Sequence, residues 1–316
     1  CSAAATGFSV QVAHSIGAGD LGKARSILRQ ALVAVGLFGI LWGVAGMSIS
    51  PFLPGWLGGD VSIRRDAFLY FLIYSAFLPV LQLYALAGSM LRCSGNMRVP
   101  SILSVLMCLL DVVFNFFLIF PTREVRWAGL AFSVPGAGWG VEGAALGTGL
   151  AELVAAGLML WFLCTRSKEL GLAREQGSFR PTAPVLKHAV RIGLPMGVEH
   201  SVICGAQIMT TVIVAPLGIF SIAANSFAIT AESLCYMPGY GIADAATTLV
   251  GQSYGAGRKD LTRRFAYITV SMGMLVMGLM GVIMYVGAPF IIGTMTPDAE
   301  VLALGVTALR IEAFAE

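Results

Sequence analysis

The sequence predicts an all-α, polytopic integral membrane protein built from two six-helix lobes, and three observations support this prediction. The first is composition, because 57% of the 316 residues are hydrophobic and 12% are charged, whereas soluble domains are about a quarter charged. The second is a series of long apolar stretches, and the third is an internal repeat. The mean hydropathy of +0.82 argues against a soluble helical bundle, whose helices carry polar faces at the 3.6-residue period.

Each apolar stretch has the length needed to cross a bilayer, about 20 residues for a hydrocarbon core about 30 Å thick. Seven complete spans are expected, at Ala31–Ser50, Ala67–Leu91, Val99–Phe120, Gly143–Cys164, Ile192–Leu217, Ile219–Val250 and Phe265–Phe290. A stretch that ends near Ser15 and another that begins near Asp298 are expected to be partial spans.

Basic residues are distributed unevenly among the connections between these spans. One set of connections holds Lys23, Arg25, Arg29, Arg92, Arg98, Arg166, Lys168, Arg174, Arg180, Lys187, Arg191, Arg258, Lys259, Arg263 and Arg264. The opposite set holds Arg64, Arg65, Arg123 and Arg126. Because positively charged short loops stay cytoplasmic, the first set predicts the cytoplasmic side of a multi-pass protein in a bacterial-type inner or plasma membrane. The net charge of +3 follows from this topology and gives no support to nucleic-acid binding.

The internal repeat appears when the chain is displaced so that Ser15–Gly19 (SIGAG) falls on Ser253–Gly257 (SYGAG). The match continues without a gap, for example from Pro51-Phe52 to Pro289-Phe290. Both Gly-Ala-Gly motifs open loops on the cytoplasmic side, so the repeats are expected to be parallel and related by an axis along the membrane normal.

Counting spans between the two motifs gives six helices per repeat, hence twelve in an intact protein and about seven complete ones here. We expect residues 1–165 to form the first lobe, from the end of helix 2 to helix 6. Residues 166–190 are expected to be a cytoplasmic linker, and residues 191–316 the second lobe, from helix 7 to the start of helix 10. On this interpretation the sequence is a piece of a longer protein.

The stretch AESLCYMPGYGIADAATTLVGQSYGAGRKDLTRR (231–264) resembles the multidrug and toxic compound extrusion (MATE) family, whose eighth helix ends in a Val-Gly-Gln-x-x-Gly-Ala signature. Further matches are LRCSGNMRVP (91–100), LLDVVFNFFLIF (109–120), GVEGAALGT (140–148), GLPMGVEH (193–200) and VAPLG (214–218). The resemblance implies two lobes around a central cavity. It also implies export of amphipathic, often cationic, organic compounds in exchange for protons or sodium ions.

Ionisable groups inside a membrane are costly and usually mark ion pathways, proton relays or buried pairs. The acids that qualify by position are Asp111, Glu152, Glu199, Glu232, Asp244 and Glu312. Asp111 and Asn115 are four residues apart and share a helix face, as do Thr148 and Glu152. These oxygen-bearing groups suit a proton or a hard cation, with Na⁺ possible at Asp111, Asn115 and Thr148. The alternative is that Asp111 and Asn115 only join helices through hydrogen bonds.

The resemblance adds to this first-lobe site. Several MATE members carry an Asn-x-x-x-Asp pair on the fifth helix and a Thr on the sixth. Asp111 and Asn115 match that pair with acid and amide exchanged, and Thr148 matches the Thr, whereas Glu152 comes from the residue argument alone.

The second lobe offers a cation candidate in Glu199, which follows Pro195 by four residues where the helix backbone is weakened. Its neighbour His200 is a further candidate, although a lone histidine in a span more often serves helix packing. Glu232 and Tyr236 share a face and would offer a carboxylate and an aromatic ring to a lipophilic cation. Two further residues, Met237 and Asp244, complete the predicted substrate-binding set, with ordinary packing as the alternative.

Other chemistry has little support. The six cysteines show no metal-ligand spacing, and the Gly-Ala-Gly motifs lack the lysine of a Walker phosphate-binding loop. We therefore expect that the protein is not an enzyme and binds no cofactor. The coupling ion is expected to be H⁺ or Na⁺. The expected partners are small amphipathic molecules, the coupling ion and the bilayer, and the protein is expected to be a monomer. Two alternatives are a flippase of the same wider superfamily, which would need basic residues in its cavity, and a non-transporting membrane sensor or scaffold.

Overall fold

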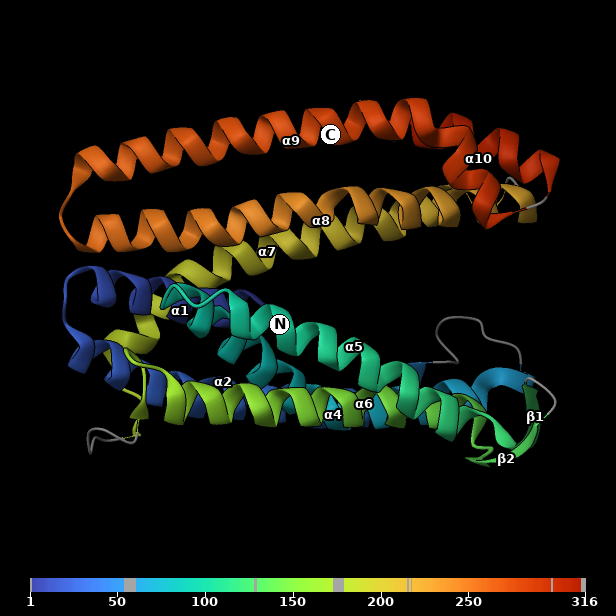
Figure 1. The fold of residues 1–316 in the computed structure, drawn as a ribbon, viewed down its shortest axis with the longest axis horizontal. Helices are drawn as coiled ribbons and strands as arrows, with labels where there is room; N and C mark the ends of the chain where they lie inside the picture. The colour runs from blue at the N-terminus through green and yellow to red at the C-terminus, as the bar shows by residue number, and fades with distance from the viewer. Residues whose placement is uncertain are drawn as a thin grey trace. The chain divides into compact units, whose positions relative to one another are not determined.

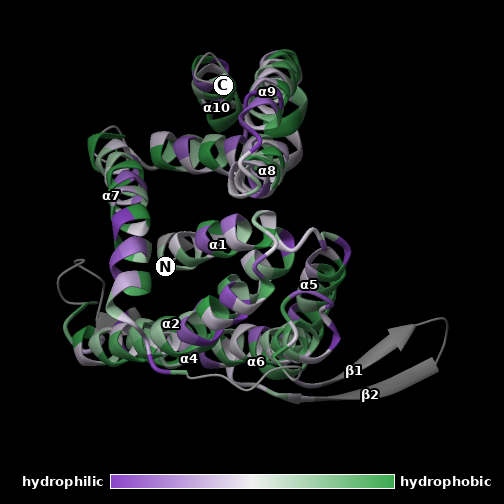
Figure 2. Cartoon of the chain, turned by 90° about the vertical axis from the view of Figure 1, so that its left-hand side faces the viewer, coloured by the Kyte–Doolittle hydropathy of each residue, from purple (hydrophilic) through white to green (hydrophobic). Residues whose placement is uncertain are grey.

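The computed structural model describes residues 2–53, 61–127, 130–172, 179–214, 216, 218–296 and 298–313 (Figure 1). It divides into two compact units, Cys1–Leu194 and Pro195–Glu316, which are considered separately below. Hydrophobic residues dominate the helices of both units (Figure 2).

Unit 1 is a helical bundle with one hairpin. Its helices are α1 (Ser2–Gly17), α2 (Leu21–Ile49), α4 (Val61–Cys93), α5 (Arg98–Ile119), α6 (Gly140–Trp161), the π-helical turn η1 (Phe162–Arg166) and the beginning of α7 (Ala183–Val214). The antiparallel strands β1 (Pro121–Trp127) and β2 (Leu130–Ala137) connect α5 to α6. Unit 2 contains the rest of α7, then α8 (Ile219–Gly255), α9 (Lys259–Met295) and α10 (Ala299–Glu312).

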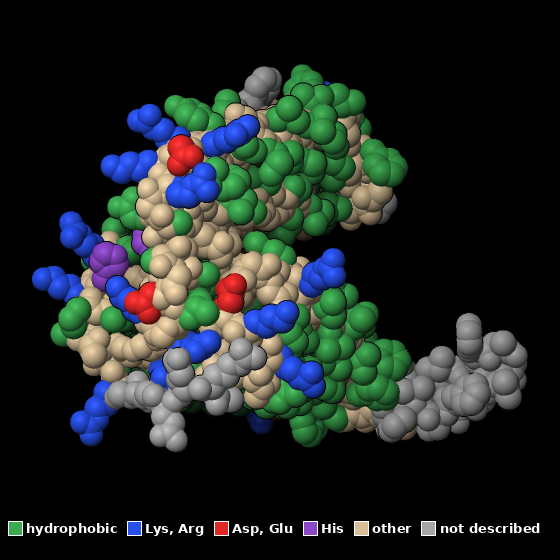
Figure 3. Space-filling model, turned by 60° about the vertical axis from the view of Figure 1, so that its left-hand side comes forward, with side chains coloured by type: hydrophobic (Ala, Val, Ile, Leu, Met, Phe, Trp, Pro, Cys, Tyr) green, Lys and Arg blue, Asp and Glu red, His purple; other side chains and the backbone are tan. Residues whose placement is uncertain are grey.

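The predicted spans correspond to long helices, and the all-α membrane fold is confirmed. Among the described residues, six helices are long and apolar enough to cross a membrane: α2, α4, α5, α6 with η1, α7 and α9. The seventh expected span, α8, forms a 37-residue helix but falls outside this set, because polar residues such as Glu232 and Asp244 lower its hydropathy. Lys and Arg side chains lie beside broad areas of hydrophobic side chains (Figure 3).

One boundary differs from the sequence-based expectation, and one connection contains structure that was not predicted. The connection between α5 and α6 forms a two-stranded hairpin, with Pro121 paired to Ala137. The helix α7 begins at Ala183, inside the predicted linker and nine positions before Ile192. Its first turns carry Lys187 and Arg191, which hydropathy alone assigns to a loop.

The Gly-Ala-Gly motifs end α1 and α8 with the same hydrogen bonds. The Gly19 N–H donates to the Ile16 carbonyl at 3.0 Å, and the Asp20 N–H to the Ser15 carbonyl at 3.0 Å. In the second copy the Gly257 N–H donates to Tyr254 at 3.0 Å, and the Arg258 N–H to Ser253 at 3.2 Å. These are paired Schellman caps, and Gly19 (φ 77°) and Gly257 (φ 71°) occupy the left-handed region that favours glycine. The motif therefore terminates helices.

The core of unit 1 joins α1, α2, α4 and α6 through fully buried side chains such as Leu28, Leu86 and Met159. Farther along, α2 packs on α4 through glycines. A Cβ on Gly39 would lie 2.8 Å from the Pro79 Cα, and one on Gly43 would lie 2.9 Å from the Ser75 carbonyl oxygen. Small residues allow this close backbone approach, as is usual between membrane helices.

The segment after α6 is fastened to α2 by buried polar side chains. The Arg25 Nε donates to the Glu169 carbonyl at 3.0 Å, and the Gln30 Oε1 accepts from the Thr182 N–H at 2.9 Å. Arg25 and Gln30 are 8% and 6% exposed. Burial raises the pKa of the Glu169 carboxyl above its usual range. This part of the predicted linker is therefore held against the first unit.

Replacing Arg25 with Ala is expected to lower the free energy of unfolding by about 2 kcal/mol, because a buried, charge-assisted hydrogen bond is lost. Arg263 is the matched control, since it holds the same repeat position on α9 but is exposed. Its replacement by Ala is expected to change stability by less than about 0.5 kcal/mol. Thermal unfolding in detergent measures both, and equal effects would contradict the anchoring role.

Candidate functional site

The first cluster of polar groups lies on α5, where Asp111 and Asn115 share a face as predicted. The Asn115 Nδ2 donates a hydrogen bond to the Asp111 Oδ1 at 3.1 Å. The Asn115 Oδ1 is buried and accepts no hydrogen bond from any described residue. A buried oxygen without a donor is costly, so this amide oxygen is suited to receive a ligand.

Helix α6 approaches this cluster through a glycine. A Cβ at Gly147 would overlap the Asn115 Oδ1, so only glycine allows α6 to lie directly on the amide. Thr148, the next residue, is half-buried, and the described residues form no hydrogen bond with its hydroxyl. Thr148 therefore lies beside the cluster without a hydrogen bond to it.

Glu152 extends the cluster one helical turn along α6. Its side chain is 7% exposed, and its carboxyl interacts electrostatically with Asp111 on α5 and with the Tyr74 hydroxyl on α4. Three helices thus converge on two carboxyls, one amide and one phenol. Tyr74 was not predicted, because other polar side chains of the same span, such as Tyr70 and Gln82, carry the same sequence signal.

Two neighbouring carboxyls such as Asp111 and Glu152 repel one another when both are charged, and the repulsion is stronger in a medium of low dielectric. A proton or a cation bound between them relieves it. The set Asp111, Asn115 and Glu152, called the α5–α6 cluster below, therefore has the chemistry of a cation or proton site. Oxygen donors are the ligands that hard cations prefer.

A second cluster lies in unit 2. The Tyr236 hydroxyl donates to the Glu232 Oε1 at 2.8 Å, so the predicted shared face on α8 is confirmed. Glu312 on α10 interacts electrostatically with Glu232, and its buried Oε2 accepts no hydrogen bond from the described residues. The sequence placed Glu312 among the intramembrane acids but not with Glu232, because that requires the packing of α10 on α8.

The remaining candidates lie apart from these clusters. Met237 is 62% exposed, and Asp244 is exposed, with its backbone carbonyl accepting from the Thr248 hydroxyl at 3.1 Å. Glu199 and His200 are exposed on α7, and the described residues of unit 2 form no hydrogen bond with either side chain. The roles predicted for these four residues stay predictions.

Comparison with known proteins identifies the family. A sequence model of the MatE family matches residues 2–117 and 195–316, which together make up most of the chain. The chain belongs to the MatE family. The two matched stretches lie in the first and second predicted lobes, as expected of a repeat.

Curated relatives extend the match along the chain. A probable multidrug resistance protein NorM from Thermotoga maritima is 25% identical over 316 residues, covering 98% of this chain and 64% of that protein. A probable NorM from Idiomarina loihiensis is 25% identical over 302 residues, covering 96% and 63%. This MatE chain therefore spans less than two thirds of the length of these relatives.

Solved structures share the fold. An outward-facing multidrug resistance MATE transporter has a TM-score of 0.83 at 20% identity, covering 98% of this chain and 66% of that one. A MOP-superfamily transporter from Pyrococcus furiosus, described as having a binding pocket of reverse polarity, has the same TM-score, identity and coverage. The MatE chain is thus a multi-pass protein of the plasma membrane with the two-lobe fold of transporters.

Proposed function

We propose that the intact protein is a secondary active multidrug efflux transporter. It exports amphipathic and cationic organic compounds from a bacterial cell by antiport with H⁺ or Na⁺, acts as a monomer, and catalyses no covalent reaction. The observation that carries the proposal is the α5–α6 cluster, in which Glu152 and Asp111 interact across two helices beside an amide oxygen without a donor. The naming of the NorM relatives as multidrug resistance proteins supports the same activity.

In this proposal the coupling ion binds at the α5–α6 cluster, either as a proton on its carboxyls or as Na⁺ held by Asp111, Asn115 and the neighbouring Thr148. Binding neutralises the carboxylates and thereby changes the relative stability of the two access states, since a ligand shifts a conformational equilibrium by its differential affinity. The two repeats then rock in alternating access.

The substrate site is proposed at Glu232, Tyr236, Met237 and Asp244 on α8. A carboxylate hydrogen-bonded to a tyrosine (2.8 Å) offers charge and a ring face to a lipophilic cation. The flexible thioether of Met237 adapts to differently shaped apolar groups. Glu199 is proposed as an additional cation-binding acid on α7.

A flippase for lipid-linked sugars is the competing function. Holding a pyrophosphate requires basic side chains in the cavity. In the two described clusters the ionisable groups are carboxyls and tyrosines, and the nearby Arg310 stacks on the Tyr285 ring, with its guanidinium carbon 5.3 Å from the ring centre. This charge pattern favours cationic substrates.

Efflux of a fluorescent lipophilic cation from loaded vesicles containing the intact protein tests the proposal. Separate imposed gradients of protons and of Na⁺ identify the coupling ion, and a labelled lipid-linked sugar is assayed in parallel. Cation efflux driven by one of the two gradients supports the proposal. Movement of the lipid alone would indicate the flippase, and no movement of either would indicate a sensor or scaffold.

Replacing Tyr236 with Phe is expected to raise the apparent KM for a cationic substrate about fivefold, with little change in maximal rate. The ring remains, but the hydroxyl that orients Glu232 is lost, which costs about 1 kcal/mol. Tyr240→Phe is the control, because Tyr240 is 60% exposed on the same helix. Equal KM values for the two variants would contradict the role of the Tyr236–Glu232 hydrogen bond.

A further inference from the structure

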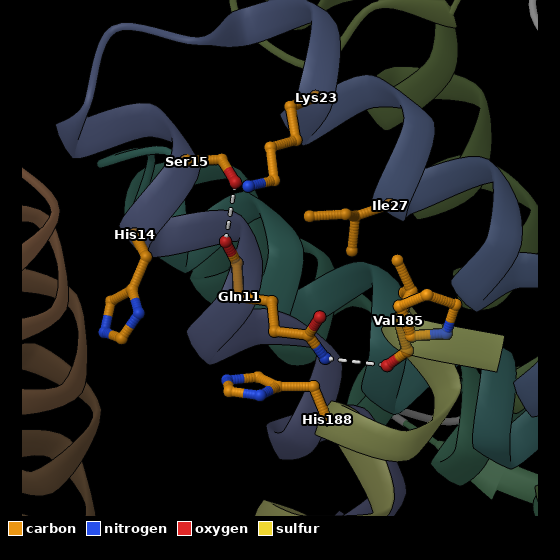
Figure 4. Close-up of a pocket in the computed structure, with 8 residues that line it drawn as sticks. Gln11, His14, Ser15, Lys23, Ile27, Val185 and His188 are labelled. Carbon is orange, nitrogen blue, oxygen red and sulfur yellow. Dashed lines mark hydrogen bonds between the residues drawn. The ribbon is translucent and has the colours of Figure 1, made fainter. Parts of the chain in front are cut away.

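A pocket separate from both acidic clusters lies in unit 1, at the helix ends where α1, α2 and α7 meet (Figure 4). Its volume is about 290 Å³, near the lower end of the range for small-molecule sites. It is lined by Gln11, His14, Ser15, Lys23, Ile27, Pro184, Val185 and His188. This lining contains one lysine, two histidines and no acid.

The floor of the pocket is built from buried polar side chains. The Gln11 Nε2 donates to the Val185 carbonyl at 3.2 Å and to the Gly7 carbonyl at 3.1 Å. The Ser15 Oγ donates to the Gln11 carbonyl at 2.9 Å (Figure 4). Gln11 and Ser15 are 8% and 6% exposed, so α1 is fastened to the first turn of α7 beneath the opening.

The rim carries one lysine and two imidazoles. Lys23 projects from the first turn of α2 toward Ser15, and the imidazoles of His14 and His188 project from α1 and α7 (Figure 4). His14 and His188 are close enough to interact electrostatically. The nearby acid in the sequence, Asp20, is engaged at the α2 N-terminus, where its Oδ1 accepts from the Lys23 backbone N–H at 2.9 Å.

The position of the pocket fits an anion at the membrane surface. It adjoins the N-terminal turn of the long helix α7, where the helix dipole adds partial positive charge. The helix ends around the pocket carry basic residues, and this is why we predict that they lie on the cytoplasmic side. Basic pockets between membrane helices on that side bind lipid head groups. A neutral imidazole also carries one N–H, which can donate a hydrogen bond to a phosphate oxygen.

We propose that this pocket binds a negatively charged phosphate group at the cytoplasmic surface, held by Lys23, His14 and His188. The phosphate group belongs either to an acidic phospholipid head group or to free inorganic phosphate, and both present the same oxygens to the same donors. The proposal does not depend on the transport activity proposed above.

Titration calorimetry of the intact protein in lipid-free detergent tests the site with three probes. These are short-chain phosphatidylglycerol, short-chain phosphatidylcholine and sodium phosphate. Saturable binding of phosphatidylglycerol with weak binding of phosphatidylcholine assigns the site to acidic lipids. Saturable binding of sodium phosphate alone assigns it to the free ion, and weaker binding at high salt is expected in both cases. Failure of both anionic probes to saturate would overturn the proposal.

Two charge reversals locate the binding. Lys23→Glu is expected to weaken binding of the anionic probe at least about tenfold, whereas Lys187→Glu is expected to change it less than about twofold. Both lysines are exposed, so both variants should fold, and they alter net charge equally, but Lys187 does not line the pocket. The milder His188→Gln should weaken binding about threefold. Equal affinities of the Lys23→Glu and Lys187→Glu variants would show that the anion is attracted by the overall positive charge of this surface. That result would also overturn the proposed site.

Discussion

Replacement of Glu152 by Gln in the intact protein is expected to reduce gradient-driven export at least about tenfold. Glu152 is 7% exposed and interacts with Asp111 across the α5–α6 interface. Gln has nearly the same shape but neither binds a proton nor carries a charge that a cation could neutralise. The cluster would then lose one of its two carboxylates and with it part of the negative charge that attracts a cation or proton. In a medium of low dielectric, the loss of such a charge typically costs more than the 1.4 kcal/mol that corresponds to a tenfold change.

The matched control is Glu142→Gln. Glu142 lies in the first turn of the same helix, near the membrane surface, and outside the α5–α6 cluster. Its replacement should leave export within about twofold of the wild type. Membrane insertion of both variants is measured by the amount of folded protein after detergent extraction. Normal export by a well-inserted Glu152→Gln variant would remove Glu152 from the coupling site.

Replacement of Gly147 by Leu is expected to damage both stability and transport. A Cβ at this position would already overlap the Asn115 Oδ1, and a full side chain would push α6 away from α5. Overpacking of a tight interface typically costs about 1–3 kcal/mol. The larger side chain would also press on the Asn115 amide, which is hydrogen-bonded to Asp111, so any protein that still folds should transport poorly.

Gly157→Leu is the control for this prediction, because Gly157 lies on the same helix and a Cβ there would meet no atom within 4 Å. It carries the same change in helix propensity and side-chain volume. Thermal unfolding in detergent and vesicle efflux measure the two effects. A Gly147→Leu protein as stable as Gly157→Leu would show that α5 and α6 do not pack through this glycine.

Much of the fold could be predicted from the sequence, because a bilayer imposes strong rules on length and hydropathy. The seven expected spans correspond to long helices, and the Gly-Ala-Gly repeat corresponds to identical caps at Gly19 and Gly257. The remaining features have physical causes that the sequence does not signal. Helix α7 starts early because Lys187 and Arg191 belong to exposed helical turns that hydropathy excludes, and the hairpin after α5 depends on strand pairing across a turn, which no apolar period signals.

Within the site, contacts along one helix were predictable and contacts between helices were mostly not. The pairs Asp111–Asn115 and Glu232–Tyr236 follow from the four-residue spacing, and both hydrogen bonds are present. The approach of Glu152 to Asp111 was expected because consecutive helices are neighbours. By contrast, Tyr74 and Glu312 join their clusters through helices distant in sequence, and the close contact at Gly147 depends on the relative rotation of α5 and α6.

The most direct test of the account compares two transport modes of Asp111→Asn in the intact protein. In loaded vesicles, substrate efflux driven by an ion gradient is measured beside substrate exchange at zero gradient. If the α5–α6 cluster couples ion to substrate, the variant should insert normally and lose gradient-driven export while exchange continues. Gradient-driven export by Asp111→Asn at the wild-type rate would contradict the account.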